Sequence, residues 1–225
     1  MSRRSIPILL LLFLSLSVNS ATNWKEGKHY FAIRPPKPSV LDNGTVKVTE
    51  VFSYGCPACN SFYPIAEKLQ ASLPDNVQFD FLPASFLPAE DWPMFQRAYC
   101  TAQVLGLVDA THTIMFDAIW KTGELAIVDP KTQRIKKTLP TIEDAAKFYN
   151  KVTGVPVEKF LATAKSFGIN TATKRADQLI KAYQVDSTPT IVINGKYRLT
   201  ASSAGGYDQL IELTNWLVAN ESSSH

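Results

Sequence analysis

The chain has 225 residues, three of them cysteines, and a formal net charge of +3 at pH 7. Its hydrophobic content of 45% is that of a globular protein with one sizeable core. The nearly balanced charge gives no reason to expect a nucleic-acid partner, and three cysteines are too few for a scaffold held together by disulfides.

The first twenty residues have the composition of a secretory signal peptide. Arg3 and Arg4 precede an apolar run that begins at Ile6, and small residues follow at Ser20 and Ala21. The apolar core is much shorter than the roughly 20 residues that span a bilayer, so a membrane anchor is the weaker interpretation. We expect cleavage near Ser20 and export to an oxidising compartment, where thiols tend to become disulfides.

A proline-rich, irregular arm follows the leader and gives way to a predicted strand. In TVKVTEVFSY (45–54) the side chains alternate, so that Val46, Val48, Glu50 and Phe52 share one face. The alternation is typical of a strand, which the next residue, a glycine, ends.

A helix is predicted directly after this strand. Cys56 stands where the helix begins, and Pro57 occupies a favoured first position. Apolar residues such as Phe62 and Ala66 then recur at helical spacing. A second strand follows in NVQFDFLPA (76–84), so the chain opens as strand, helix and strand, like the start of an α/β sheet.

The middle of the chain is predicted to be helical throughout. Four segments with acidic residues near their starts and glycines or turns at their ends indicate helices over 89–107, 109–123, 141–154 and 156–168. A long helix over 170–185 then leads to a hairpin, in which Asn194 and Gly195 are the residues of a type I′ turn. A last helix begins near Tyr207. This pattern indicates one α/β domain with a helical insertion.

The CPAC sequence at Cys56 and Cys59 is compatible with three kinds of site. A structural zinc site needs four ligands, and the other candidates are scattered without the usual spacing. They are Cys100, His29, His112 and His225. A purely structural disulfide would close a very short loop and so constrain the unfolded chain little.

Redox exchange is the favoured interpretation because of where the motif lies. A thiol at a helix N-terminus meets unpaired backbone N–H groups and the positive end of the helix dipole, and both stabilise a thiolate. We therefore expect Cys56 to be the exposed nucleophile and Cys59, one turn deeper, to resolve the mixed disulfide. Cys100 is expected to be an inert, partly buried thiol, with an intermolecular or regulatory disulfide as the alternative.

Taken together, these features resemble a known family. A strand, a CPxC motif, a helical insertion and STPT before a hairpin are similar to the thioredoxin-fold disulfide oxidoreductases, and specifically to the bacterial periplasmic DsbA family. The resemblance covers nearly the whole chain after the leader and includes WKEGKHY, FSYGCPAC and TPTIVINGKY.

The resemblance implies an α/β thioredoxin fold with an all-helical insertion domain. The expected parts are a signal peptide (1–20), a first part of the thioredoxin domain with its N-terminal arm (21–84), the helical insertion (85–170) and the second part of the thioredoxin domain (171–225).

The resemblance also implies roles for single residues. Pro189 would be a cis-proline that faces the disulfide, and Thr188 would offer its backbone to an extended substrate; a trans turn proline is the alternative. Glu50 resembles the acidic residue that relays a proton to or from Cys59. Its alternative is an ordinary solvated strand carboxylate, whereas burial under the active site would raise its pKa.

The implied function is a dithiol oxidase that donates the Cys56–Cys59 disulfide to unfolded or reduced exported proteins in the periplasm. A DsbB-like membrane quinone oxidoreductase would restore the disulfide, and the protein would be a monomer without cofactor or metal. Ala58 departs from the family, many of whose members carry histidine there, and this favours a milder oxidant. A reductase or isomerase on the same fold, or a peptide-binding module without turnover, are the alternatives.

Overall fold

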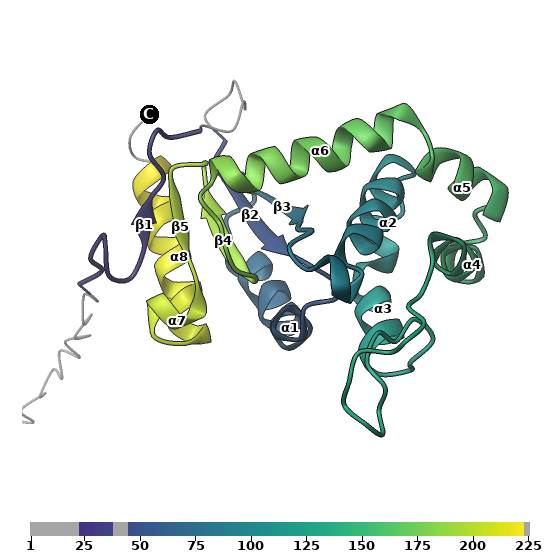
Figure 1. Cartoon of the computed structure of the whole chain (residues 1–225). Coiled ribbons are helices and arrows are strands. Elements are labelled where there is room, and N and C mark those ends of the chain that lie inside the picture. Colours follow the sequence, from purple (N-terminus) through teal and green to yellow (C-terminus); the bar gives the residue numbers. More distant parts are fainter. Residues whose placement is uncertain (1–22, 38–44, 223–225) are drawn as a thin grey trace, which may run out of the picture.

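The computed structural model describes residues 23–37 and 45–222, and the predicted signal peptide over 1–20 lies outside them. The described residues form one mixed sheet with the strand order β1-β5-β4-β2-β3 (Figure 1). The strands are β1 (Phe31–Ala32), β2 (Lys47–Phe52), β3 (Gln78–Pro83), β4 (Thr190–Ile193) and β5 (Tyr197–Leu199).

The helices cover both faces of the sheet and build a separate bundle beside it (Figure 1). They are α1 (Pro57–Ser72), the 3-10 turn η1 (Pro88–Glu90), α2 (Trp92–Val104), α3 (Val108–Trp120), α4 (Ile142–Thr153), α5 (Val157–Ala164), α6 (Phe167–Ala182), α7 (Ala201–Ala204) and α8 (Tyr207–Ser222). The bundle consists of α2 to α5, which lie between β3 and α6 in the chain. The predicted α/β fold with a helical insertion is therefore confirmed.

Strand β2 is the inner strand on which the rest of the sheet is assembled. It pairs with β3 in parallel and with β4 in an antiparallel ladder, in which Val48 lies opposite Ile193 and Glu50 opposite Ile191. Paired residues share a face, so Val48 and Glu50 point to the same side as these two isoleucines. On that side Val48 and Ile193 pack with the buried stripes of α1 and α8.

The N-terminal arm and one helix boundary differ from the prediction. The arm was expected to be irregular, but Phe31 and Ala32 form β1, which pairs with β5. A helix was expected to end at Gly168, whereas α5 ends at Ala164 and α6 already begins at Phe167. The reason is local: the side chain of Ser166 accepts a hydrogen bond from the backbone N–H of Ile169 and caps α6.

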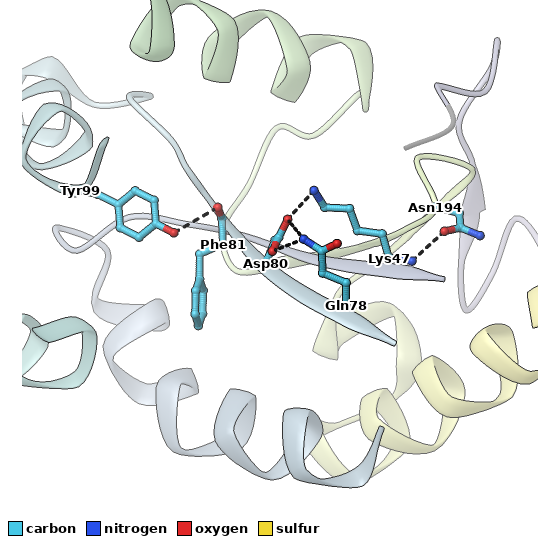
Figure 2. Close-up of polar contacts among 6 residues, drawn as sticks. All are labelled: Lys47, Gln78, Asp80, Phe81, Tyr99 and Asn194. Atoms are coloured by element: carbon cyan, nitrogen blue, oxygen red, sulfur yellow. Dashed lines mark hydrogen bonds and ion pairs between the residues drawn. The ribbon is translucent and has the colours of Figure 1, made fainter. Parts of the chain in front are cut away.

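Polar side chains tie the β3 edge of the sheet to its neighbours (Figure 2). Lys47 of β2 forms an ion pair with Asp80 of β3, and its backbone N–H donates to the Asn194 side chain (2.8 Å). The Tyr99 hydroxyl of α2 donates to the carbonyl of Phe81 (3.4 Å). The helical insertion thus contacts the backbone of β3 directly. None of the helices in the described part of the chain is long and apolar enough to cross a membrane.

The turn between β4 and β5 provides a test of the fold. Gly195 has φ +61°, and a Cβ there would lie 1.7 Å from the Lys37 carbonyl oxygen. Gly195→Ala should therefore lower the free energy of unfolding by roughly 2 kcal/mol or more. Gly168→Ala is the matched control, because that glycine is helical and its Cβ would have ordinary contacts; it should be neutral or stabilising by about 0.5–1 kcal/mol. Equal losses in urea denaturation would contradict this explanation.

Candidate active site

Cys56 is the N-cap residue of α1. Its backbone is extended (φ −88°, ψ 117°), and its Sγ accepts a hydrogen bond from the backbone N–H of Cys59 at 3.4 Å. Its own N–H donates to the Ser53 carbonyl at 3.1 Å, which closes the turn that leads from β2 into the helix. Pro57 supports this start, since the first helical residue needs no N–H partner. The sulfur therefore occupies the place of a capping oxygen. The expectation that Cys56 is exposed is wrong: its exposed fraction is 5%, because the Thr188 loop packs against it.

The loop before β4 lies against this sulfur. The Thr188–Pro189 peptide bond is cis, as the resemblance implied. In its protonated form the Cys56 thiol donates to the Thr188 carbonyl at 3.5 Å, although the two residues are 132 positions apart in the chain. The Thr188 hydroxyl is buried beside the Cys56 sulfur and helps to lower the pKa of Cys56. The fold thus brings Cys56, Cys59 and the Thr188–Pro189 bond together at the start of α1.

The pKa values of the two motif cysteines are shifted in opposite directions. A hydrogen bond from the Cys59 thiol lowers the pKa of Cys56 to about 6, against the opposing effect of burial, and the backbone N–H groups of Ala58 and Cys59 add to the lowering. Burial raises the pKa of Cys59 well above its usual value, and the hydrogen bond to Cys56 raises it further. In the dithiol, Cys56 is therefore the thiolate and Cys59 keeps its proton.

Glu50 is a buried carboxyl, with an exposed fraction of 2%. Its Oε2 atom makes no hydrogen bond, and desolvation raises the pKa of the carboxyl to about 8, with a smaller effect from Cys56. The charge of Glu50 in turn helps to raise the pKa of Cys59. The structure therefore excludes the solvated strand carboxylate and makes Glu50 a protonated group near both cysteines at neutral pH.

Three residues of the helical insertion hold the active-site loop and were not found from the sequence. The indole N–H of Trp120 donates to the Tyr54 carbonyl at 2.8 Å, and the Tyr54 hydroxyl shares a hydrogen bond with His112 Nδ1 at 2.9 Å. Trp92 covers Gly55 so closely that a Cβ on this glycine would lie 2.8 Å from the indole ring. These contacts connect residues that are far apart in the chain, and no local pattern marks them.

The third thiol, Cys100, lies away from the two motif cysteines. Cys100 is buried in α2, and burial raises its pKa to about 11, which is the environment of an unreactive thiol. All three cysteines are free thiols in the structure. Within residues 23–37 and 45–222, no group of three or more histidine, cysteine or acidic side chains is placed to hold a metal ion.

Comparisons with known proteins agree with this geometry. A family model described as Thioredoxin matches residues 42–213. The thiol:disulfide interchange protein DsbA of Pseudomonas aeruginosa is 35% identical over 201 residues, which are 89% of this chain and 87% of that protein. The chain belongs to the DsbA family. DsbA of Azotobacter vinelandii is 32% identical over 91% of this chain and 88% of its own length.

Solved structures show the same relationship. The crystal structure of Pseudomonas aeruginosa DsbA superposes with a TM-score of 0.75 at 35% identity, covering 91% of this chain and 97% of that one. DsbA of Xylella fastidiosa gives a TM-score of 0.74 at 30% identity, covering 88% and 97%. The protein is a thiol:disulfide oxidoreductase with a thioredoxin fold and a helical insertion.

The acidity of Cys56 can be measured directly. The rate of alkylation of Cys56 by iodoacetamide should rise with a midpoint near pH 6, because the thiolate is the reactive form. Cys59→Ala should move this midpoint upward, since it removes the hydrogen bond that contributes most to the lowering. Cys100→Ala is the matched control and should leave the midpoint in place. A midpoint near 8.5 in the unchanged protein would contradict the assignment.

The burial of Glu50 predicts a pH-dependent stability. Its folded pKa of about 8 lies above the ordinary value of 4.5, so in this window the folded carboxyl keeps a proton that the unfolded chain releases. Its contribution to stability is therefore lost as the pH rises from 4.5 to 8. Replacing Glu50 by Gln removes this loss.

The free energy of unfolding of the oxidised Glu50→Gln protein, relative to the parent, should therefore increase by about 3 kcal/mol between pH 4 and pH 7. Guanidinium denaturation of both proteins at the two pH values measures this change. The oxidised form is used because its motif cysteines do not titrate. A difference that is the same at both pH values would show that Glu50 ionises normally.

Proposed function

We propose that the protein is a dithiol oxidase that donates its Cys56–Cys59 disulfide to exported proteins. The observation that carries this direction is the lowered pKa of Cys56. A stabilised thiolate favours the dithiol over the disulfide, and a disulfide whose reduced form is stabilised is a stronger oxidant. The opposite direction, reduction of substrate disulfides, would require a dithiol that gives up its electrons readily.

The first step is attack of a substrate thiolate on Sγ of Cys56 in the oxidised enzyme. A bond forms between the two sulfurs, and the Cys56–Cys59 bond breaks, so that Cys59 leaves as a thiolate. The raised pKa of Cys59 means that this leaving group takes up a proton at neutral pH. Glu50, which is protonated there and interacts with Cys59, is the proposed source of that proton.

The second step releases the oxidised substrate. A second substrate thiolate attacks the substrate sulfur of the mixed disulfide, forms the new substrate disulfide and expels Cys56. The low pKa of Cys56 makes it a good leaving group. The attacking thiolate in this step must therefore come from the substrate. The resolving role predicted for Cys59 applies to the reverse reaction, in which Cys59 attacks Cys56 in the mixed disulfide and restores the enzyme disulfide. Overall the enzyme gains two electrons and one proton at neutral pH: Cys59 holds the proton, and Cys56 remains a thiolate.

The Thr188–Pro189 segment is the proposed contact for the substrate backbone. It lies against the sulfur that is attacked, with the Thr188 carbonyl 3.5 Å from Cys56 Sγ. An extended substrate that pairs with the backbone of Thr188 would place its own thiolate beside Cys56. Backbone pairing of this kind accepts many sequences, as a general oxidase requires.

The proposal includes where the protein works and how it is recycled. The predicted signal peptide and the DsbA relatives support a periplasmic location and unfolded or reduced exported proteins as substrates. A DsbB-like membrane quinone oxidoreductase would take the two electrons from the dithiol and restore the disulfide. We further propose a monomer, with an insertion domain over 85–170.

A reductase is the second candidate, and Ala58 is the observation that favours it. This position lies between the two cysteines and is exposed, and alanine offers no side-chain donor to the thiolate. An enzyme with histidine there would have an additional source of thiolate stabilisation. The choice between the two directions therefore depends on how far the helix N-terminus and Cys59 compensate for the missing donor.

Two serine variants test the exchange mechanism. Cys56→Ser should abolish oxidation of a reduced peptide, because it removes the sulfur that is attacked. Cys59→Ser should also lose turnover but accumulate mixed disulfides at Cys56, visible by mass spectrometry after incubation with oxidised glutathione. Cys100→Ser is the control and should keep full activity. An active Cys56→Ser protein would rule out this mechanism and leave binding without turnover.

A further inference from the structure

The segment between α3 and α4 forms a well-defined hairpin, which we call the 128–137 hairpin. A β-bridge joins Val128 to Ile135, and the backbone N–H of Asp129 donates to the Arg134 carbonyl at 2.8 Å. The N–H of Lys136 donates to the Ile127 carbonyl at 2.9 Å and continues the pairing. Backbone hydrogen bonds therefore join the two arms of this connection.

The base of the hairpin is fixed in the protein core. Leu125 and Ile127 are buried with exposed fractions of 2% and 1%. Trp120, the last residue of α3, holds the carbonyl of Tyr54, which lies two residues before Cys56 in the active-site loop. Figure 1 shows the connection between α3 and α4 projecting beyond the helices of the insertion. The hairpin is thus a hydrogen-bonded projection with a buried base, and the helix that precedes it contacts the active-site loop.

The hairpin carries a concentrated positive charge. Four of the seven residues over 131–137 are cations, all exposed, and none forms an ion pair with a residue that the structure describes. They are Lys131, Arg134, Lys136 and Lys137. The one carboxylate on the hairpin, Asp129, accepts hydrogen bonds from the backbone N–H groups of Lys131 and Thr132. The cations are therefore concentrated in a chain of nearly balanced charge.

Apolar surface lies among these cations. Ile135, between Arg134 and Lys136, has an exposed fraction of 41%. A cavity of about 480 Å³ opens at the base of the hairpin. Ile119, Ala126 and Val128 supply apolar parts of its wall, while Lys121 and Lys136 supply cations. The projection therefore combines positive charge with apolar contact area.

We propose that the 128–137 hairpin docks the protein on an anionic phospholipid bilayer. The hairpin projects from the insertion and is exposed over residues 130–138, so it suits a broad anionic surface. Cations with an adjacent exposed aliphatic side chain are the composition of segments that bind at the lipid–water interface. A protein partner would need a larger apolar contact area than one exposed isoleucine among four cations supplies, which is why the bilayer is the favoured occupant.

Docking at this hairpin would orient the enzyme. Trp120 connects the hairpin base to the loop that carries Cys56, so the active-site end of the insertion would lie near the lipid surface. Binding to lipid does not depend on the direction of the redox reaction, so the two proposals can fail separately. The proposal is tested by vesicle binding, which needs no substrate.

The test is co-sedimentation of the chain from residue 21 onward with vesicles of phosphatidylcholine, with and without phosphatidylglycerol. Binding is expected only to the vesicles that contain phosphatidylglycerol and should weaken as salt is raised. The test variant replaces all four hairpin cations by Gln. Each basic side chain near an anionic surface strengthens binding roughly fivefold, so this variant, which lacks four of them, should bind roughly 600-fold more weakly.

The matched control removes the same charge from the exposed surface elsewhere, in Lys159, Lys174, Arg175 and Lys181, also by Gln. It should keep most of the binding. Ile135→Ser keeps every cation and should bind roughly threefold more weakly, because it loses apolar contact with the interface. Circular dichroism checks that each variant is folded; Ile135→Ser, with its single exposed replacement, still tests the proposal if the fourfold variant is not.

Three results would overturn the proposal. The first is equal loss of binding in the hairpin and control variants, which would show attraction by net charge alone. The second is displacement from vesicles by soluble glycerol phosphate at constant ionic strength, which would show a site for a free phosphate group. The third is binding to polyglutamate without binding to vesicles, which would show a preference for acidic polypeptides.

Discussion

The chemistry of this protein depends on a sulfur that takes the place of a helix cap. Cys56 stands at the N-terminus of α1, where backbone N–H groups have no partner within the helix, and its Sγ accepts one of them from Cys59. A helix can begin here because the turn from β2 is closed by the bond from Cys56 to Ser53 and because Pro57 follows. The backbone N–H groups at the start of the helix also favour the thiolate, and they add to the larger effect of the hydrogen bond from the Cys59 thiol.

Around this sulfur, the fold buries two ionisable side chains that would ordinarily be exposed to water. Cys59 is fully buried and keeps its proton, and Glu50 is buried on the inner strand of the sheet with an unpaired oxygen. A carboxyl in such a place destabilises the protein at neutral pH, and its position beside the cysteines is what the proposed proton transfer to Cys59 requires. The helical insertion contributes by holding the loop before Cys56, through Trp120 and Trp92. The insertion is therefore part of the active-site architecture as well as a neighbour of the sheet.

Much of the fold and the position of the motif cysteines could be predicted from local sequence patterns. The features that could not be predicted depend on burial or on contacts between distant segments. The strand before the motif, the helix after it and the Asn194–Gly195 turn follow from alternation, helical spacing and turn chemistry, which act over a few residues. The burial of Glu50 could not be decided from the alternation alone, because a carboxyl on an inner strand and one on an exposed strand give the same pattern. The contacts of Tyr54 with His112 and Trp120 join distant segments and have no local signal. Strand β1 was missed because two residues that complete an edge carry no periodicity.

The measurement that tests the central claim most directly is the redox equilibrium of the Cys56–Cys59 pair with glutathione, at several pH values, read by trapping the thiols. The lowered pKa of Cys56 predicts a potential above that of the glutathione couple, with a change of slope near pH 6, where the thiolate takes up its proton. This result would make the protein a donor of disulfides even with Ala58 in the motif. A potential as low as that of cytosolic reductants, without a change of slope near pH 6, would contradict the account and make the protein a reductase.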